Sequence, residues 1–432
     1  MMAQRLNSSD PDFAAKFKEF ANAPREGASE VGATVADIIA AVRERGEAAL
    51  QHYTKEFDKF HLTDENIAIS EEECAAAEAA CDPEALKALA FAAERIRAYH
   101  EKQRPEDILY TDDAGVTLGW RWTPVEAAGL YAPGGLAAYP SSVLMNAIPA
   151  KVAGVKRLCL CVPTPGGHAN PLVLAAARIS GVDEIYRIGG AQAIAAMAYG
   201  AGPIEPVDVI VGPGNAYVAE AKRQVFGQVG IDAIAGPSEI LVVADKHNDP
   251  AWIAADLLSQ AEHDPSSQAV LITDDAAFAD AVEQAVEDQI DVSPRKKIAA
   301  AAWEDNSAII VVASLDAAPG LVDQIAPEHL ELAVENPQAL AAKVRHAGAI
   351  FLGRFAPEAI GDYVAGPDHV LPTARAARHA SGLSVLHFMK RTSIIGCDEK
   401  ALAAIGPAAA KLADAEGLPN HAASIRLRLG SE

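Results

Sequence analysis

The chain has 432 residues, of which 50% are hydrophobic and 22% are charged, so it can bury a core and form two or three domains. Its formal net charge of −23 argues against nucleic acid or an anionic membrane as a partner, because both attract clustered Lys and Arg. The five cysteines form no Cys-x-x-Cys pair, which argues against a disulfide framework or a thiolate zinc site.

The N-terminal sequence, MMAQRLNSSDPDFAAKF, lacks the apolar core of a signal peptide, and no stretch provides the roughly 20 apolar residues that cross a bilayer. We therefore expect a cytoplasmic protein. Residues 1–30 are polar and loosely patterned, and we interpret them as an N-terminal arm. A helix is predicted next, because apolar residues recur on one face between residues 35 and 42 and Gly46 follows. Residues 71–103 are typical of two further helices.

The pattern then changes to apolar runs that alternate with helical stretches. The runs are GLYAP, RLCLCV, EIYRIGG, VDVIVG, EILVVAD, AVLITD, SAIIVVA and AIFLG. Strands that alternate with helices predict an α/β protein with mostly parallel sheets, and runs without polar alternation indicate strands buried on both faces. The last 50 or so residues contain no convincing strand and are expected to be helical.

We expect two Rossmann-like lobes between the arm and a C-terminal helical extension. The predicted division is an arm of 1–30, a first lobe of 31–129 and 237–381, a second lobe of 130–236, and an extension of 382–432.

Two glycine turns join predicted strands to predicted helices. Gly189 and Gly190 form the first, in IGGAQAIAAMAYG, and Gly212 and Gly214 form the second, in VGPGNAYVAEAKR. Glycine lets the backbone approach a ligand, and the new helix offers free N–H groups to a phosphate. Neither turn matches Gly-x-Gly-x-x-Gly, so on this evidence alone an ordinary α/β turn is the simpler interpretation. A third turn, YAPGGLAAYPSS, is longer than a simple connection needs.

Several polar residues have a composition that suits a metal or proton-transfer site. Gln260 and His263 are three residues apart on a predicted helix and could share a ligand, although such pairs are common by coincidence. Glu328 and His329 supply a carboxylate beside an imidazole, which could instead be a solvated pair.

Two further segments carry carboxylate and imidazole groups. Asp362, Asp368 and His369 lie in a predicted loop within AIGDYVAGPDHVLPT, and Glu416 and His421 lie near the end in AEGLPNHAASI. A loop of this composition between apolar elements is common at functional sites, but each segment alone could consist of ordinary polar surface residues.

Together these segments resemble histidinol dehydrogenase in amino-acid sequence and in their order over nearly the whole chain. The matching segments are RGEAALQHYTKEFDKF, GLYAPGGLAAYPSSVLMNAIPAKVAGV, IGGAQAIAAMAYG, VGPGNAYVAEAKR, AGPSEILVVAD, DLLSQAEHDPSSQ, APEHLEL, GDYVAGPDHVLPT, SVLHFMKRTS and AEGLPNHAASIRLR. So extended a match is far more specific than any single motif.

The resemblance implies the following ligand and substrate contacts. A zinc ion would be held by Gln260, His263, Asp362 and His421, and NAD would contact Tyr131, Gln192 and Asn215. L-Histidinol would contact Ser238, Gln260, His263, Glu328, His329, Asp362, His369, Glu416 and His421. The resemblance also implies a homodimer in which the C-terminal segment reaches into the partner's site. This sequence has Asp368 where the family often has Asn, which bears on the charge of the pocket.

The implied reaction is the two-step oxidation of L-histidinol through L-histidinal to L-histidine, the last step of histidine biosynthesis. His329 would be the proton-transfer group in both oxidations, and Glu328 would activate the water that hydrates the aldehyde. The alternatives are a zinc- and NAD-dependent dehydrogenase of another amino or sulfonated alcohol, a zinc hydrolase, or a non-catalytic metal-binding protein. The glycine turns argue against the hydrolase, and the presence of both Glu328 and His329 argues against the non-catalytic protein.

Overall fold

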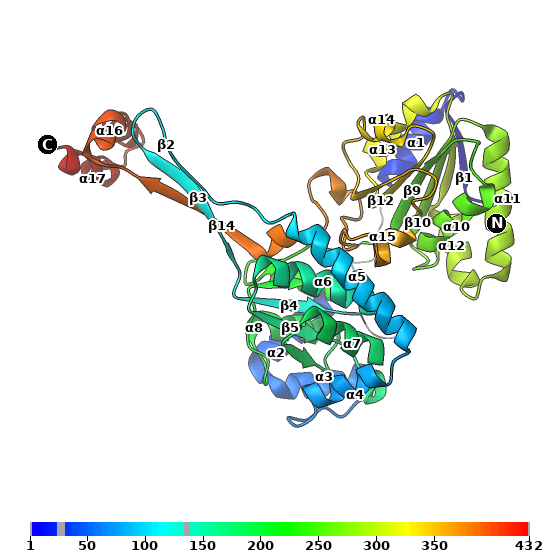
Figure 1. Ribbon diagram of the computed structural model, residues 1–432, viewed down its shortest axis with the longest axis horizontal. Coiled ribbons are helices and arrows are strands. Elements are labelled where there is room, and N and C mark those ends of the chain that lie inside the picture. Colours follow the sequence, from blue (N-terminus) through cyan, green and yellow to red (C-terminus); the bar gives the residue numbers. More distant parts are fainter. Residues whose placement is uncertain (1, 24–30, 134–138, 235, 431–432) are drawn as a thin grey trace.

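The computed structural model describes residues 2–23, 31–133, 139–234 and 236–430. Within these ranges the chain forms two α/β bodies and a long arm that projects from them (Figure 1). Parts of the sequence-predicted N-terminal arm, of the turn after Tyr131 and of the C-terminal extension, namely residues 24–30, 134–138 and 431–432, lie outside the described residues. The expected α/β class with mostly parallel sheets is confirmed.

The first body is built on a five-stranded parallel sheet of order β6-β5-β4-β7-β8. Its strands are β4 (Ala127–Tyr131), β5 (Arg157–Cys161), β6 (Glu184–Tyr186), β7 (Val209–Val211) and β8 (Gly230–Ile231). One face packs on α4 (Glu71–Ala79), α5 (Pro83–Glu101), α6 (Pro140–Ala153) and α7 (Pro171–Ser180). The other face packs on α2 (Gly32–Arg45), α3 (Glu47–Phe57), α8 (Gly190–Tyr199) and α9 (Ala216–Val225).

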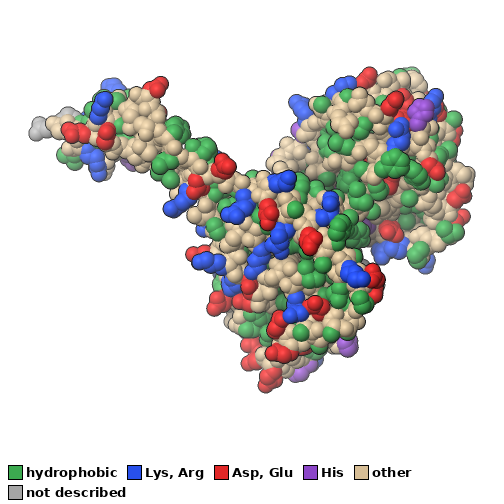
Figure 2. Space-filling view, in the orientation of Figure 1, with side chains coloured by type: hydrophobic (Ala, Val, Ile, Leu, Met, Phe, Trp, Pro, Cys, Tyr) green, Lys and Arg blue, Asp and Glu red, His purple; other side chains and the backbone are tan. Residues whose placement is uncertain are grey.

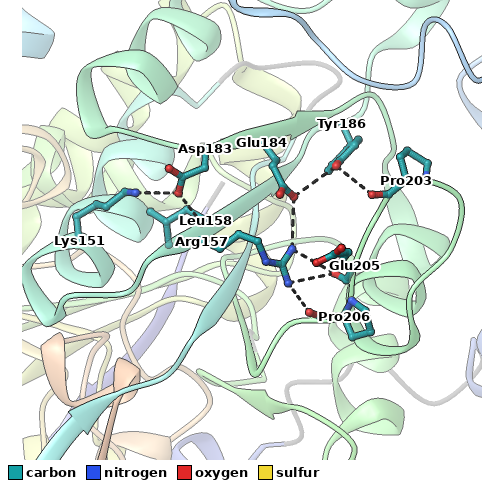
Figure 3. Close-up of polar contacts among 9 residues, drawn as sticks. All are labelled: Lys151, Arg157, Leu158, Asp183, Glu184, Tyr186, Pro203, Glu205 and Pro206. Carbon is teal, nitrogen blue, oxygen red and sulfur yellow. Dashed lines mark hydrogen bonds and ion pairs between the residues drawn. The ribbon is translucent and has the colours of Figure 1, made fainter.

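Polar contacts close the amino edge of this sheet. The Arg157 guanidinium donates to the carbonyl of Pro206 and, at 3.4 Å, to the Glu184 carboxylate, and Tyr186 Oη donates to the carbonyl of Pro203 at 3.2 Å (Figure 3). These contacts tie the loop before β7 to the sheet. The opposite, carboxyl edge carries the glycine turns.

The second body is built on a six-stranded parallel sheet of order β1-β11-β10-β9-β12-β13. Its strands are β1 (Gln4–Asn7), β9 (Glu239–Ala244), β10 (Gln268–Thr273), β11 (Ala308–Val311), β12 (His329–Ala333) and β13 (Ala349–Leu352). One face packs on α1 (Phe13–Asn22), α13 (Ala318–Ile325) and α14 (Pro337–Ala341), and the other on α10 (Pro250–Ala261), α11 (Ala276–Val292) and α12 (Lys296–Asn306). The short helix α15 (Ala359–Tyr363) follows β13. Short 3-10 turns span Pro165–Gly167, Leu315–Ala317, Ala376–Arg378 and Val385–Phe388.

The structure corrects the expected division of the chain in two places. Residues 4–22, expected in a loose arm, form β1 and α1, and β1 pairs with β11 as the edge strand of the six-stranded sheet. Residues 32–101, grouped in the sequence with 237–381, instead pack on the five-stranded sheet through α2, α3, α4 and α5. Hydrophobic periodicity identifies a helix face but does not say which sheet that face covers.

The projecting arm is a three-stranded antiparallel ribbon that ends in two helices (Figure 1). Its elements are β2 (Ile108–Thr111), β3 (Thr117–Pro124), β14 (Met389–Gly396), α16 (Glu399–Ala415) and α17 (Pro419–Leu429). The expected helices are present, but the expectation of no strand after residue 382 is wrong, because β14 pairs with β3 along its whole length. Most of β14 is exposed, so its sequence lacks the apolar alternation of a half-buried strand.

The arm exposes large apolar side chains. Figure 2 shows hydrophobic side chains along its surface, and Ile395, Leu412 and Leu427 are 74%, 65% and 78% exposed. An extended arm with apolar groups of this kind is typical of a surface that packs against another chain. Among the described residues, no helix has the length and apolar character needed to span a bilayer.

Candidate functional site

A buried histidine stands where β12 begins. His329 is 3% exposed, and its Nδ1 lies 2.9 Å from the backbone carbonyl oxygen of Glu239 in β9. Because a carbonyl oxygen only accepts, Nδ1 carries the proton, and Nε2 holds the free lone pair of the neutral ring. Burial lowers the pKa of His329, which favours that neutral form. The histidine is therefore arranged as a base that acts through Nε2.

Two carboxyl groups approach this nitrogen. His329 Nε2 lies 3.5 Å from Glu358 Oε1 and 3.9 Å from Asp362 Oδ1. Glu358 is 1% exposed and precedes α15, which carries Asp362. Burial and then the nearby Glu358 raise the pKa of Asp362 to about 8. One ligand atom from each of the three residues can be chosen so that all lie within 4.8 Å of one another, which is compact enough to hold a metal ion.

The surroundings of this cluster suit a cation. Among the described residues, His329 Nε2 and Glu358 Oε1 are buried acceptors without a hydrogen-bond partner. Buried polar atoms without partners are costly, and a bound ion with its own ligands removes that cost. Gln260 lies in the last turn of α10 beside Ser259, whose hydroxyl donates to Glu358 Oε2 at 3.0 Å. Mixed nitrogen and oxygen donors of this kind fit a catalytic metal.

The sequence predicted Gln260 and His263 on one helix, but α10 ends at Ala261 and does not include His263. It lies two residues beyond the helix and is exposed. Its charge nevertheless contributes to lowering the pKa values of His329 and His369, so it stands near both. The structure therefore brings Gln260, His263 and Asp362 into one neighbourhood.

A second histidine joins the two bodies. His369 Nδ1 lies 3.1 Å from the carbonyl oxygen of Asp362, and its Nε2 lies 3.1 Å from the hydroxyl of Ser142 in α6. Nδ1 therefore donates, and Nε2 accepts from the hydroxyl. Burial lowers the pKa of His369 to about 4, so the ring is neutral near neutral pH. A cleft of about 850 Å³ opens beside His369, His329 and Asp362.

Glu328 lies immediately before β12 with its side chain anchored. Its Oε2 accepts a hydrogen bond from the backbone N–H of Glu239 at 2.9 Å, and the residue is 7% exposed. Burial raises the pKa of Glu328 well above its usual range, so the carboxyl can take up a proton near neutral pH. Ser238, just before β9, lies at the same edge of the sheet, because β9 and β12 are parallel neighbours.

The residues expected at the cofactor lie at the carboxyl edge of the five-stranded sheet. Tyr131 ends β4, and Asn215 caps α9 after β7, with its Oδ1 accepting from two backbone N–H groups at 3.1 Å. The chain adds β5 and β6 on one side of β4 and β7 on the other, so a topological switch point falls between β4 and β7. Ligands of open parallel sheets bind at such a point.

The two glycine turns are connected through Tyr131. Its hydroxyl accepts a hydrogen bond from the backbone N–H of Gly190 at 3.0 Å. A Cβ on Gly212 would lie 2.1 Å from the Tyr131 carbonyl oxygen, so the second turn packs directly on the same residue. Gln192 is 1% exposed, and its Oε1 is buried without a hydrogen-bond partner among the described residues.

Glu416 and His421 are not brought to this site within one chain. Both are exposed: Glu416 directly follows α16 and His421 lies in α17, and these helices end the arm, remote from α15 and β12 (Figure 1). Sequence reasoning missed Glu358, because a lone Glu in FAPEAIGDY carries no spacing signal. The Asp368 carboxylate is buried, and its Oδ2 lies 3.9 Å from His100 Nε2, so it faces α5.

Comparisons with known proteins identify the family of this chain. A sequence profile of the histidinol dehydrogenase family matches residues 21–429. Histidinol dehydrogenases from Rhodospirillum rubrum and Ruegeria pomeroyi are 62% and 61% identical to this chain, and each alignment covers 99% of both sequences. The crystal structure of histidinol dehydrogenase from Elizabethkingia anophelis has a TM-score of 0.94 at 38% identity and covers 99% of this chain and 98% of that one. The chain therefore belongs to the histidinol dehydrogenase family.

Proposed function

We propose that this protein oxidises L-histidinol to L-histidine in two NAD-dependent steps with L-histidinal between them, as the last step of histidine biosynthesis. The observation that carries the proposal is His329, a buried neutral base whose free Nε2 faces a carboxylate-lined cleft. Family membership over the whole chain supplies the substrate class. The cytoplasmic location stays a prediction.

The donor set supports zinc as the metal. Gln260, His263 and Asp362 would hold it from one subunit, and His421 of the partner subunit would complete the set. When bound, the ion would serve mainly as a template that fixes the imidazole and amino groups of the substrate. Ser238, His369 and Glu416 would complete the substrate contacts. The structural support for this assignment is the compact grouping of Asp362 with Glu358 and His329, beside the last turn of α10, which carries Gln260.

Proton transfers follow from the protonation states of two side chains. His329 Nε2 would take the hydroxyl proton in the first oxidation, and the proton of the hydrated aldehyde in the second. Glu328 would accept a proton from the water that hydrates the aldehyde, because burial raises the pKa of its carboxyl group. NAD, when bound, accepts one hydride in each step, so each turnover consumes two NAD and one water and yields two NADH.

The NAD site would use Tyr131, Gln192 and Asn215. Support comes from their places at the carboxyl edge of the five-stranded sheet, beside the switch point between β4 and β7. The cleft between the two bodies would then bring the nicotinamide to the substrate beside His329.

We further propose a homodimer that exchanges its arms. The arm carries Glu416 and His421 away from its own site and exposes apolar side chains. Crossing to a second copy would bury these side chains and deliver both residues to the partner's cleft.

The activity is tested by following NADH absorbance with a panel of alcohols. L-Histidinol should yield two NADH per molecule, whereas other amino or sulfonated alcohols should yield NADH slowly or not at all. A faster reaction with another alcohol would overturn the substrate assignment, and the absence of NADH with every alcohol would overturn the dehydrogenase assignment.

A further inference from the structure

A buried ion pair holds both polar groups of one residue in the second glycine turn. Gly212 donates its N–H to Asp232 Oδ2 at 2.8 Å, and its carbonyl oxygen accepts from Lys222 Nζ at 3.0 Å. The ammonium and the carboxylate also contact each other directly, and their side chains are only 3% and 2% exposed. The N–H and C=O groups of Gly212 are therefore fixed by opposite charges.

Three segments meet at this point. Lys222 lies two turns into α9 and reaches back past the start of its own helix, whereas Asp232 follows β8. Gly212 itself follows β7 and has φ +115°, a conformation that side-chain-bearing residues rarely adopt. The ion pair thus joins the end of β7, the helix after it and the neighbouring strand.

Lys222 is not arranged as a phosphate ligand. Its ammonium is buried, and its contacts go to the Asp232 carboxylate and the Gly212 carbonyl. A lysine that binds phosphate directly would present its charge at an open surface. The ion pair therefore contacts the backbone of the turn and does not face the solvent.

Stability alone is a weak explanation for such a pair. Removing two charges from water costs several kcal/mol per ion, and well-packed apolar residues often stabilise a fold as well or better. A buried pair that also fixes a backbone turn gives a defined geometry, which apolar side chains cannot impose on N–H and C=O groups.

We propose that Lys222 and Asp232 are positioning residues for the dinucleotide, acting through the Gly212 peptide. This inference rests on the proposed NAD site. The pair sets the orientation of the turn between β7 and α9, and so the approach of the backbone and of Asn215 to the cofactor. Both side chains are buried and bond to each other and to the Gly212 peptide, so the effect falls on cofactor binding more than on chemistry.

The test compares Lys222→Met with Arg223→Met in the zinc-loaded enzyme. Arg223 is the next residue of α9, is exposed and forms an ion pair with the nearby Glu220, so its replacement removes the same charge away from the turn. NAD affinity is measured by calorimetric titration, and KM for NAD and kcat by NADH absorbance. Lys222→Met should weaken NAD binding by about tenfold or more, with zinc content and the KM for L-histidinol unchanged. Wild-type NAD affinity in Lys222→Met would overturn the inference.

In Lys222→Met, the Asp232 carboxylate is left buried without its ion-pair partner, so a second variant is needed if the first does not fold. Lys222→Met combined with Asp232→Asn leaves no charge and keeps an acceptor for the Gly212 N–H, but removes the donor to its carbonyl. Weakened NAD binding in this folded variant supports the inference, and unchanged binding overturns it. If wild type and Arg223→Met both fail to bind NAD, the proposed function itself fails. If wild type and Lys222→Met instead bind NAD equally tightly, only the positioning role is refuted and the proposed function stands.

Discussion

The Oε1 atom of Glu358 lies 3.5 Å from Nε2 of His329, and both atoms are buried without a hydrogen-bond partner among the described residues. We predict that Glu358→Gln weakens zinc binding by about 10–100-fold, because groups that surround metal ligands set their orientation and charge. Competition with a chelator measures the affinity without relying on activity. Glu304→Gln, on the exposed face of α12, is the matched control. Equal zinc affinity in the two variants would exclude a role for Glu358 at the metal.

Zinc binding should release a proton near neutral pH. The pKa of Asp362 is raised to about 8 from 3.8 by burial and by Glu358, so the metal-free carboxyl is largely protonated at pH 7. A ligand must be deprotonated, so zinc affinity should rise with pH until about pH 8. Calorimetry in two buffers of different ionisation enthalpy counts the protons, and Asp362→Asn should release about one fewer. The same count in both proteins would contradict this prediction.

The raised pKa of Asp362 also makes the stability of the metal-free protein depend on pH. An acid whose pKa is higher in the folded than in the unfolded chain binds more protons when folded. The contribution of Asp362 to stability is therefore greatest at or below pH 4 and is lost as pH rises from about 4 to about 8. Denaturant titrations of metal-free protein across this range should show less of this pH dependence in Asp362→Asn.

Glu328→Gln should separate the two oxidations. The first hydride transfer needs no water, so it should survive better than the second, which should slow by about 10²–10⁴-fold with loss of the proton acceptor. Rapid mixing with NAD should show a first NADH per site followed by a slow second phase. Two oxidations at the wild-type rate would rule out water activation by Glu328.

Gly212→Ala should destabilise the fold more than Gly227→Ala. Both glycines have a positive φ, +115° and +102°, but an added Cβ would lie 2.1 Å from the Tyr131 oxygen at Gly212 and meets nothing within 4 Å at Gly227. Gly227→Ala should cost about 1–2 kcal/mol of the free energy of unfolding from backbone strain alone. Urea titration gives both values, and equal losses would show that the contact with Tyr131 is unimportant.

Arm exchange predicts complementation between two inactive chains. In a mixed dimer of His329→Ala and His421→Ala, one crossed site receives both changes and the other receives neither, so activity should return. Without crossing, every site keeps one change. Subunits are exchanged, the mixed dimer is isolated with two affinity tags, and NADH formation is measured. A purified mixed dimer without activity would refute the shared site and leave the chemistry intact.

Much of the fold follows from patterns that are local in the sequence. All eight apolar runs contain strands, and seven of these strands are buried or nearly buried on both faces. The exception is the edge strand β13, whose Ile350 and Leu352 are 40% and 43% exposed. The strand β12 was not predicted, because HLELA places Glu331 inside the sheet, where burial raises the pKa of its carboxyl group to about 10. A charged residue in a buried strand hides the pattern on which prediction depends.

The candidate site was predictable only in part. Composition and spacing drew attention to Gln260, Glu328 and His329, and the structure places their elements together. Glu358 gives no such signal, and neither does the Lys222–Asp232 pair, whose members lie 10 and 20 residues beyond Gly212. These groups come together through strand order, which local sequence does not encode.

The edge strand β1 has a consequence for the order of folding during synthesis. All strands of the five-stranded sheet lie between residues 127 and 231, whereas Gln4 pairs with Ala308. During synthesis on the ribosome, β1 is therefore made long before its partner β11, and the whole five-stranded sheet is made between them. An unpaired strand can template aggregation, but β1 has only four residues, and its Gln4 and Arg5 side chains are exposed. The six-stranded sheet thus takes its edge from a strand that is made well before all of its neighbours in that sheet.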